Sequence, residues 1–275
     1  MLILQRELAL NLKNMIASNH TLGKPPVTRQ RLVLMPSEGG IEPHEILEDD
    51  RVLVQLPHSY DDTVLELVVV EEIPKITGPV LKQIIQLIKE RNVPELTTLL
   101  ASQEGYLDLK YQNLKPDDFL QLTNALFQNT SIISINLEYN QIGESTDLLI
   151  PLLAQNTSIT NINLSSNRLR NAGAISLAEA LKQNNYLTSI DLSNNTIGDR
   201  GAMSLAEAFK QNNSITRINF NNNMFAYPGA ISLAGALRQN TSITEISFAG
   251  IDLSRKARAE LEAVQAARPS LEIKF

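Results

Sequence analysis

Between residues 104 and 275, two kinds of segment alternate, and they differ in the spacing of their hydrophobic residues. Short segments such as 162–164 alternate apolar and polar residues, which is the period of a β-strand with one buried face. The segments between them, such as 173–184 (GAISLAEALKQN), space apolar residues at the intervals of an amphipathic helix. Their alanines allow close packing of a helix on the strands. The pattern therefore predicts a β–α unit that recurs along the chain.

The unit repeats about every 28 residues. The pattern Leu-x-x-Leu-x-Leu-x-x-Asn-x-Leu, with Ile or Phe allowed for Leu, places asparagines 27, 28 and 28 residues apart at Asn140, Asn167, Asn195 and Asn223. Weaker copies begin at Glu104 and Ile243. One strand and one helix cannot bury their apolar faces alone, so the units must stack. We expect the four asparagines to be buried turn residues that satisfy backbone groups of adjacent coils.

This pattern resembles the leucine-rich repeat family, in the ribonuclease-inhibitor-like subtype of 28 residues. That subtype also occurs in bacterial effectors, NOD-like receptors, tropomodulins and the Ran GTPase-activating protein. The resemblance covers residues 104–275, with about six repeats and a terminal strand. It implies an α/β solenoid with a parallel sheet on the concave side and helices on the convex side. Because many proteins use this scaffold, the resemblance alone implies no particular activity.

The preceding residues do not fit the repeat. Residues 1–76 are expected to form a small α+β domain, with a helix up to Ser18, a linker over 19–26 and an antiparallel sheet. Its strands are expected in the β-rich runs that start at Arg31, Arg51 and Thr63.

Residues 77–103 are expected to form a helical cap. Two helices that start at Pro79 and Pro94 have proline in the first turn, where its missing N–H is tolerated. They should cover the open hydrophobic end of the solenoid. At the other end we expect a helix over 255–267 and an edge strand within 271–275.

Composition narrows the possible partners and compartment. The net charge of −6 gives no basic surface for nucleic acid, and no apolar run is long enough for membrane insertion. There is no cysteine, and charges interrupt the first apolar run, which therefore does not match a signal peptide. We expect a cytoplasmic protein, or one that a bacterium secretes into the host cytosol without a cleavable signal peptide.

Four Asn-x-Ser/Thr sequons occur at the same place in successive repeats. They begin at Asn129, Asn156, Asn212 and Asn240. Glycans on coils only about 4.8 Å apart would crowd one another. We therefore interpret the sequons as helix-to-strand turns in a protein that does not meet the glycosylation machinery.

The search for catalytic chemistry predicts no catalytic residue, metal or cofactor. All three histidines precede the repeats, and acidic loop residues beside a single histidine favour a solvated loop. The set considered for a metal was His44, Asp49, Asp50, His58 and Asp61. Two weaker alternatives stay open. Residues 56–68 are similar to the opening of an F-box, although the β-branched residues there favour a strand. By analogy with the Ran GTPase-activating protein, Arg168, Arg170 and Arg200 are candidates for GTPase activation.

The strand register predicts the binding residues. Outward positions form columns of mostly short, neutral side chains, interrupted by tyrosines at the N-terminal end of the sheet. The predicted concave binding set is Tyr106, Asp108, Lys110, Tyr111, Asn136, Glu138, Tyr139, Asn163, Asp191, Arg217, Asn219 and Glu245. The tyrosines are either a binding hot spot or a contact for the N-terminal domain.

The sequence thus predicts a non-catalytic protein-protein interaction module. The regular, asparagine-rich, cysteine-free repeats look like those of effectors from intracellular bacteria, which would bind a host protein through the concave face. The alternatives are a eukaryotic cytosolic regulator or adaptor, acting in ubiquitin ligation or GTPase regulation, and an enzyme whose site lies within residues 1–75.

Overall fold

The computed structural model describes residues 30–36, 44–46, 65–71 and 73–275. The chain divides into two compact units, Met1–Pro74 and Lys75–Phe275. The helix predicted up to Ser18, the linker over 19–26 and the strand predicted from Arg51 lie outside the described residues.

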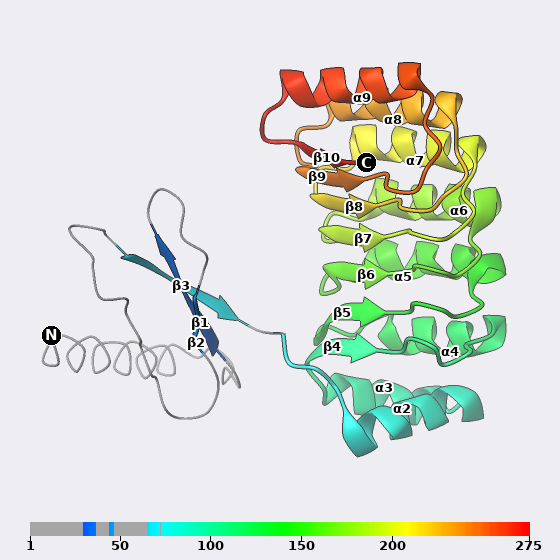
Figure 1. Ribbon diagram of the computed structural model, residues 1–275. Helices are drawn as coiled ribbons and strands as arrows, with labels where there is room; N and C mark the ends of the chain where they lie inside the picture. Colours follow the sequence, from blue (N-terminus) through cyan, green and yellow to red (C-terminus); the bar gives the residue numbers. More distant parts are fainter. Residues whose placement is uncertain (1–29, 37–43, 47–64, 72) are drawn as a thin grey trace, which may run out of the picture. The chain divides into compact units, whose positions relative to one another are not determined.

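The first unit contains a three-stranded antiparallel sheet in the order β2-β1-β3 (Figure 1). Its strands are β1 (Gln30–Pro36), β2 (His44–Ile46) and β3 (Leu65–Glu71). β1 and β3 coincide with two of the three β-rich runs that the sequence indicated, and they pair antiparallel. The strand at β2 was not predicted, because three residues are too few to show an alternating pattern.

The second unit is built on a parallel sheet of seven strands that follow one another in chain order (Figure 1). The strands are β4 (Gly105–Asp108), β5 (Ile132–Asn136), β6 (Asn161–Asn163), β7 (Ser189–Asp191), β8 (Arg217–Asn219), β9 (Glu245–Ser247) and β10 (Glu272–Lys274). Each strand is followed by a helix that returns the chain to the start of the next strand, except β10. The predicted α/β solenoid is confirmed.

The helices line one side of this sheet (Figure 1). They are α2 (Gly78–Glu90), α3 (Val93–Ala101), α4 (Pro116–Leu126), the 3₁₀ helix η1 (Gly143–Leu148), α5 (Leu149–Gln155), α6 (Arg170–Gln183), α7 (Asp199–Gln211), α8 (Tyr227–Gln239) and α9 (Arg255–Ala267). None of these helices lies on the opposite side of the sheet, which we call the strand face. It corresponds to the predicted concave side.

One coil departs from the regular repeat. The 27-residue step between Asn140 and Asn167 contains η1 and the short α5 in place of one long helix. Pro151 lies in the first turn of α5, where backbone N–H groups have no partner within the helix, so the N–H that proline lacks is not missed. Further inside a helix, the proline would remove a backbone hydrogen bond. The proline therefore limits how early an α-helix can begin in this coil.

A single hydrophobic core runs through the second unit. Fully buried side chains from α2 and α3, such as Ile84 and Leu96, belong to the same cluster as the repeat leucines. Close packing of successive helices depends on glycine at the helix starts. A Cβ added at Gly201 would lie 2.9 Å from the Cβ of Ala174, which is closer than two such atoms approach.

The predicted asparagine ladder is present and buried. Asn195 donates from Nδ2 to the carbonyls of Leu164 (2.8 Å) and Ser193 (3.1 Å). Its Oδ1 accepts from the backbone N–H of Asn167 (2.9 Å) and Leu169 (3.3 Å). One amide therefore links its own coil to the preceding coil, as the sequence predicted. Asn140, Asn167, Asn195 and Asn223 are all buried, and Asn167 donates in the same way, but its Oδ1 accepts no hydrogen bond from the described residues.

A second asparagine ladder lies where each helix leads into the next strand. Asn212 donates to the carbonyls of Leu181 (2.9 Å) and Asn184 (2.8 Å) and accepts from the N–H of Ile215 (2.9 Å). The ladder comprises Asn129, Asn156, Asn184, Asn212 and Asn240, all buried. Its sequon asparagines are therefore structural turn residues, as interpreted, and Asn184 has the same role without a sequon.

Arg268 ends this second ladder. It stands 28 residues after Asn240, and its guanidinium donates to four carbonyls of the preceding coil, those of Leu237, Asn240, Thr241 and Ile243. The longer side chain thus takes the place of an asparagine at the last turn. Burial lowers the pKa of Arg268 from its ordinary value.

Candidate protein-binding face

The predicted columns of the strand face are in register. The strand pairing aligns Tyr106, Ser134, Asn161, Ser189, Arg217 and Glu245 in one column. It aligns Asp108, Asn136, Asn163, Asp191, Asn219 and Ser247 in the next. The residues between the two columns, such as Ile135 and Ile162, are buried. The column residues therefore lie on the side of the sheet that carries no helix.

Several polar side chains of the second column make hydrogen bonds within the fold. Asn136 accepts a hydrogen bond at Oδ1 from the N–H of Glu138 (3.0 Å), and Asn163 accepts one from the N–H of Ser165 (2.9 Å). Asp191 and Asn219 make the same bond to the residue two places on. These bonds close a turn after each strand. Sequence reasoning missed this role, although asparagine or aspartate at the start of a turn was the available signal.

The residues before α2 cover the N-terminal edge of the sheet. Lys75 and Tyr106 form an isolated parallel β-bridge through their backbones, and the N–H of Ile76 donates to the carbonyl of Tyr106 (2.9 Å). The Lys75 ammonium lies 2.8 Å from the Asp108 carboxylate and 5.4 Å from the centre of the Tyr106 ring. The hydrogen bond to Asp108 raises the pKa of Lys75. Tyr106 and Asp108 therefore form an intramolecular cluster with Lys75, a residue that the sequence analysis had assigned to the end of the N-terminal domain.

Tyr111 and Tyr139 form a stacked aromatic pair. Their ring centroids are 4.7 Å apart with an interplanar angle of 21°. The side chains are 60% and 53% exposed. Partial desolvation raises the pKa of Tyr111, and the nearby Glu138 carboxylate adds to this effect. Register had placed the two tyrosines side by side, and the structure brings their rings into contact.

Both tyrosines have a left-handed backbone conformation. Their φ angles are +59° and +54°, a region that bulky side chains rarely adopt. The same position in later coils holds Ser166, Asn194, Asn222 and Gly250, also with positive φ. Glycine and asparagine suit this conformation, whereas a tyrosine there costs about 1 kcal/mol of conformational energy. The first two coils therefore carry the least suited side chains.

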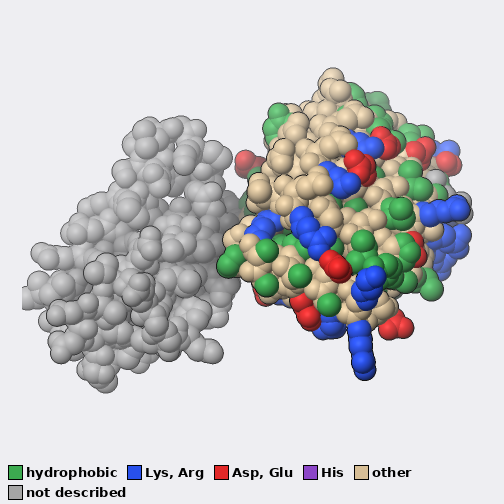
Figure 2. Space-filling view, turned by 90° about the horizontal axis from the view of Figure 1, so that it is seen from above, with side chains coloured by type: hydrophobic (Ala, Val, Ile, Leu, Met, Phe, Trp, Pro, Cys, Tyr) green, Lys and Arg blue, Asp and Glu red, His purple; other side chains and the backbone are tan. Residues whose placement is uncertain are grey.

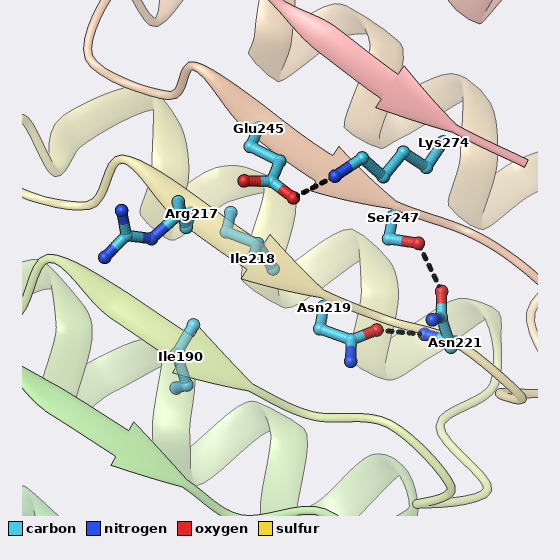
Figure 3. A pocket seen from close by; sticks show the side chains of 8 residues that line it. All are labelled: Ile190, Arg217, Ile218, Asn219, Asn221, Glu245, Ser247 and Lys274. Atoms are coloured by element: carbon cyan, nitrogen blue, oxygen red, sulfur yellow. Dashed lines mark hydrogen bonds and ion pairs between the residues drawn. The ribbon is translucent and has the colours of Figure 1, made fainter. Parts of the chain in front are cut away.

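A shallow depression of about 230 Å³ lies at the other end of the strand face (Figure 3). It is lined by Ile190, Arg217, Ile218, Asn219, Asn221, Glu245, Ser247 and Lys274. Glu245 and Lys274 form an ion pair of 2.5 Å, and this bond raises the pKa of Lys274. The Arg217 side chain extends away from that pair (Figure 3). Of the predicted set, Arg217, Asn219 and Glu245 meet here.

Charges of both signs are mixed on the surface. Figure 2 shows Lys and Arg side chains interspersed with Asp and Glu over the described unit. Lys110 and the three candidate arginines, Arg168, Arg170 and Arg200, are exposed. Arg168 and Arg170 have positive φ angles.

The described residues show no metal-binding cluster. Within them, no group of three or more His, Cys, Asp or Glu side chains is placed to hold a metal ion. Of the set considered from the sequence, only His44 falls in a described strand, and Asp49, Asp50, His58 and Asp61 lie outside. Across the same part of the chain, no helix is long and apolar enough to cross a membrane.

Comparison with known proteins agrees with the repeat architecture. A family model described as leucine-rich repeat matches residues 155–178 and 183–206. The repeats form a leucine-rich-repeat fold. No curated protein sequence matches the chain.

Two solved structures are similar to part of the chain. Actin-binding site 2 of leiomodin-1 is 18% identical, with a TM-score of 0.41, covering 69% of this chain and 90% of that chain. The C-terminal domain of tropomodulin from Caenorhabditis elegans is 15% identical, with a TM-score of 0.44, covering 52% of this chain and 89% of that chain. At this level of identity the likeness concerns the fold alone.

Proposed function

We propose that the leucine-rich-repeat solenoid is a non-catalytic protein-binding module and that Tyr111 and Tyr139 are its binding hot spot. The observation that carries this proposal is the pair of exposed tyrosines in a left-handed conformation. Later coils hold smaller residues at this position with the same backbone, so folding does not require tyrosine. Strain of this kind concentrates at functional sites. Tyrosine is also enriched in binding hot spots.

The size of the strand face sets a condition on the partner. Seven strands spaced at about 4.8 Å span about 29 Å, and four exposed positions at about 3.3 Å give a width near 13 Å. The product, about 400 Å², is half of the roughly 800 Å² that each partner buries in a standard interface. The proposed partner therefore also contacts surfaces beyond these four positions of each coil.

The proposed setting is that of an effector from an intracellular bacterium that binds a host protein. Regular, asparagine-rich repeats without cysteine support it, because such repeats resemble those of bacterial effectors and need no oxidising compartment. The partner should then be captured from host-cell lysate.

Capture with matched variants tests the proposed function. The full chain and the double variant Tyr111→Asn with Tyr139→Asn are used as baits in host-cell lysate. Asparagine is chosen because Asn194 and Asn222 already occupy this position. We expect the double variant to lose a partner that the native chain retains, with affinity reduced about 30-fold or more.

The matched control for this experiment is Tyr186→Asn. Tyr186 is 48% exposed and lies in the turn between α6 and β7, outside the predicted binding set. This variant should capture the partner as the native chain does. Equal capture by the native chain and the double variant would contradict the proposed hot spot.

A further inference from the structure

Three successive coils present side chains from the same backbone geometry. The N–H of Tyr111 donates to Glu138 O (3.0 Å), that of Tyr139 to Ser165 O (3.1 Å) and that of Ser166 to Ser193 O (3.0 Å). The φ angles of Tyr111, Tyr139 and Ser166 are +59°, +54° and +58°. Their Cβ atoms therefore leave the backbone in the same direction, and only the side chains differ.

The two rings stack along the direction in which the coils stack. Their centroid spacing of 4.7 Å matches the spacing of about 4.8 Å between adjacent strands. One face of the Tyr139 ring is covered by Tyr111. The other face is turned toward the next coil, where Ser166 ends at its hydroxyl group. The aromatic stack therefore stops at Ser166. The backbone there would direct a ring onto Tyr139, but the serine side chain is too short to fill that space.

We infer that the protein partner places an aromatic side chain over Ser166, as the third ring of the stack. This inference rests on the proposed function and specifies the partner's chemistry at the same site. Offset-stacked rings attract each other beyond the area they bury. The neighbouring Asn194 is exposed, and its amide can hydrogen-bond the polar atom of a Tyr or Trp ring.

The variant Ser166→Tyr tests this inference by filling the third position from within the chain. The probe is a phage-displayed library of short random peptides, selected on the full 275-residue chain. We expect the peptides that require Tyr139 to be enriched in Tyr, Trp or Phe. Ser166→Tyr should weaken them about tenfold. Ser166→Ala, which leaves the position open, should bind them within about twofold.

Tryptophan fluorescence gives a direct readout of these affinities. The protein has no Trp, so a selected peptide with one Trp is the only source of indole emission. Melting curves check that each variant is folded. Should Ser166→Tyr destabilise the fold, Ser166→His supplies a smaller flat ring that tolerates positive φ, and the same weakening is expected.

Two results would overturn the inference while leaving the proposed hot spot intact. One is selection of peptides that require Tyr139 but contain no enriched aromatic residue, and the other is unchanged affinity for Ser166→Tyr. A third result is distinct. Selected peptides that are indifferent to Tyr139→Asn would contradict the proposed function together with the inference that rests on it.

Discussion

Asn195 illustrates how one side chain maintains the register of the repeat. Its amide makes two donor bonds and two acceptor bonds to backbone groups of its own coil and the preceding coil. All of these groups are shielded from water, so their hydrogen bonds are costly to leave unmade.

Asn195→Leu should destabilise the protein by about 1 to 3 kcal/mol, because leucine leaves these buried backbone groups without hydrogen-bond partners. Urea denaturation measures the change in unfolding free energy. Asn185→Leu, at an exposed site ten residues earlier, is the control and should change it little. A loss below about 0.3 kcal/mol for Asn195→Leu would contradict the ladder role.

Arg268 gives a second test at the residue scale. Arg268→Ala should cost about 1 to 3 kcal/mol, because four carbonyls of the preceding coil lose their donors. Arg268→Asn should recover part of the loss, since asparagine fills the same position in the preceding coils. Thermal melting of both variants makes the comparison. Equal losses for the two would mean that the amide cannot replace the guanidinium.

At the scale of elements, Asp118 connects α2 to the first helix of the repeats, α4. Its carboxylate accepts from Lys89 Nζ of α2 (2.6 Å) and from the N–H of Lys115 at the start of α4 (3.0 Å). Burial alone would raise the pKa of Asp118, but these hydrogen bonds and the charge of Lys89 hold it below its ordinary value. The carboxylate therefore stabilises the folded state only while it is ionised.

Asp118→Asn should lower stability by about 1 to 2 kcal/mol at neutral pH. Because the folded pKa is depressed, the carboxylate's contribution is present above the unfolded pKa of about 4 and is lost as pH falls through the folded pKa. The native and variant melting temperatures should therefore converge in acid.

Asp117→Asn is the matched control for this experiment. The Asp117 carboxylate pairs with Arg91 (2.6 Å), but both side chains are well exposed, so its removal should cost little. A difference for Asp118→Asn that stays constant with pH would contradict the assigned charge interaction.

The elements that could be predicted are those with a repeated or long pattern. Four in-register copies of the repeat defined the strands, and long periodic segments defined α2 and α9. Three features could not be read from pattern. β2 is three residues long, η1 lies in the coil shortened by one residue, and Lys75 with Ile76 joins the sheet edge without belonging to a repeat.

At the scale of the whole molecule, α2 and α3 are predicted to act as a cap. A chain that begins at Lys75 should fold, since it keeps both helices and the contacts of Lys75 and Ile76 with Tyr106. A chain that begins at Glu104 should aggregate, because it exposes core residues that α2 and α3 bury. Light scattering and melting curves distinguish the two. A monomeric shorter chain with an unchanged melting temperature would refute the capping role.

The candidate site was partly predictable from register. The sequence placed Tyr111 and Tyr139 in one column, because the repeat fixes which residues are neighbours. It could not show that Tyr106 belongs to the separate Lys75 cluster, since that contact joins residues outside the repeat pattern. Nor could it show the positive φ of the tyrosines, because tyrosine is not a residue that indicates this conformation.

The most direct test of a tyrosine hot spot is to measure stability and affinity on the same double variant, Tyr111→Asn with Tyr139→Asn. Asparagine relieves the unfavourable backbone conformation while the stacking of the rings is lost, so these two effects on stability oppose each other. We predict a melting temperature within a few degrees of the native value, and partner affinity reduced about 30-fold or more. A clear fall in the melting temperature of the full chain with unchanged affinity would contradict the account. The tyrosines would then serve the fold, as a contact for the N-terminal unit would, and not the partner.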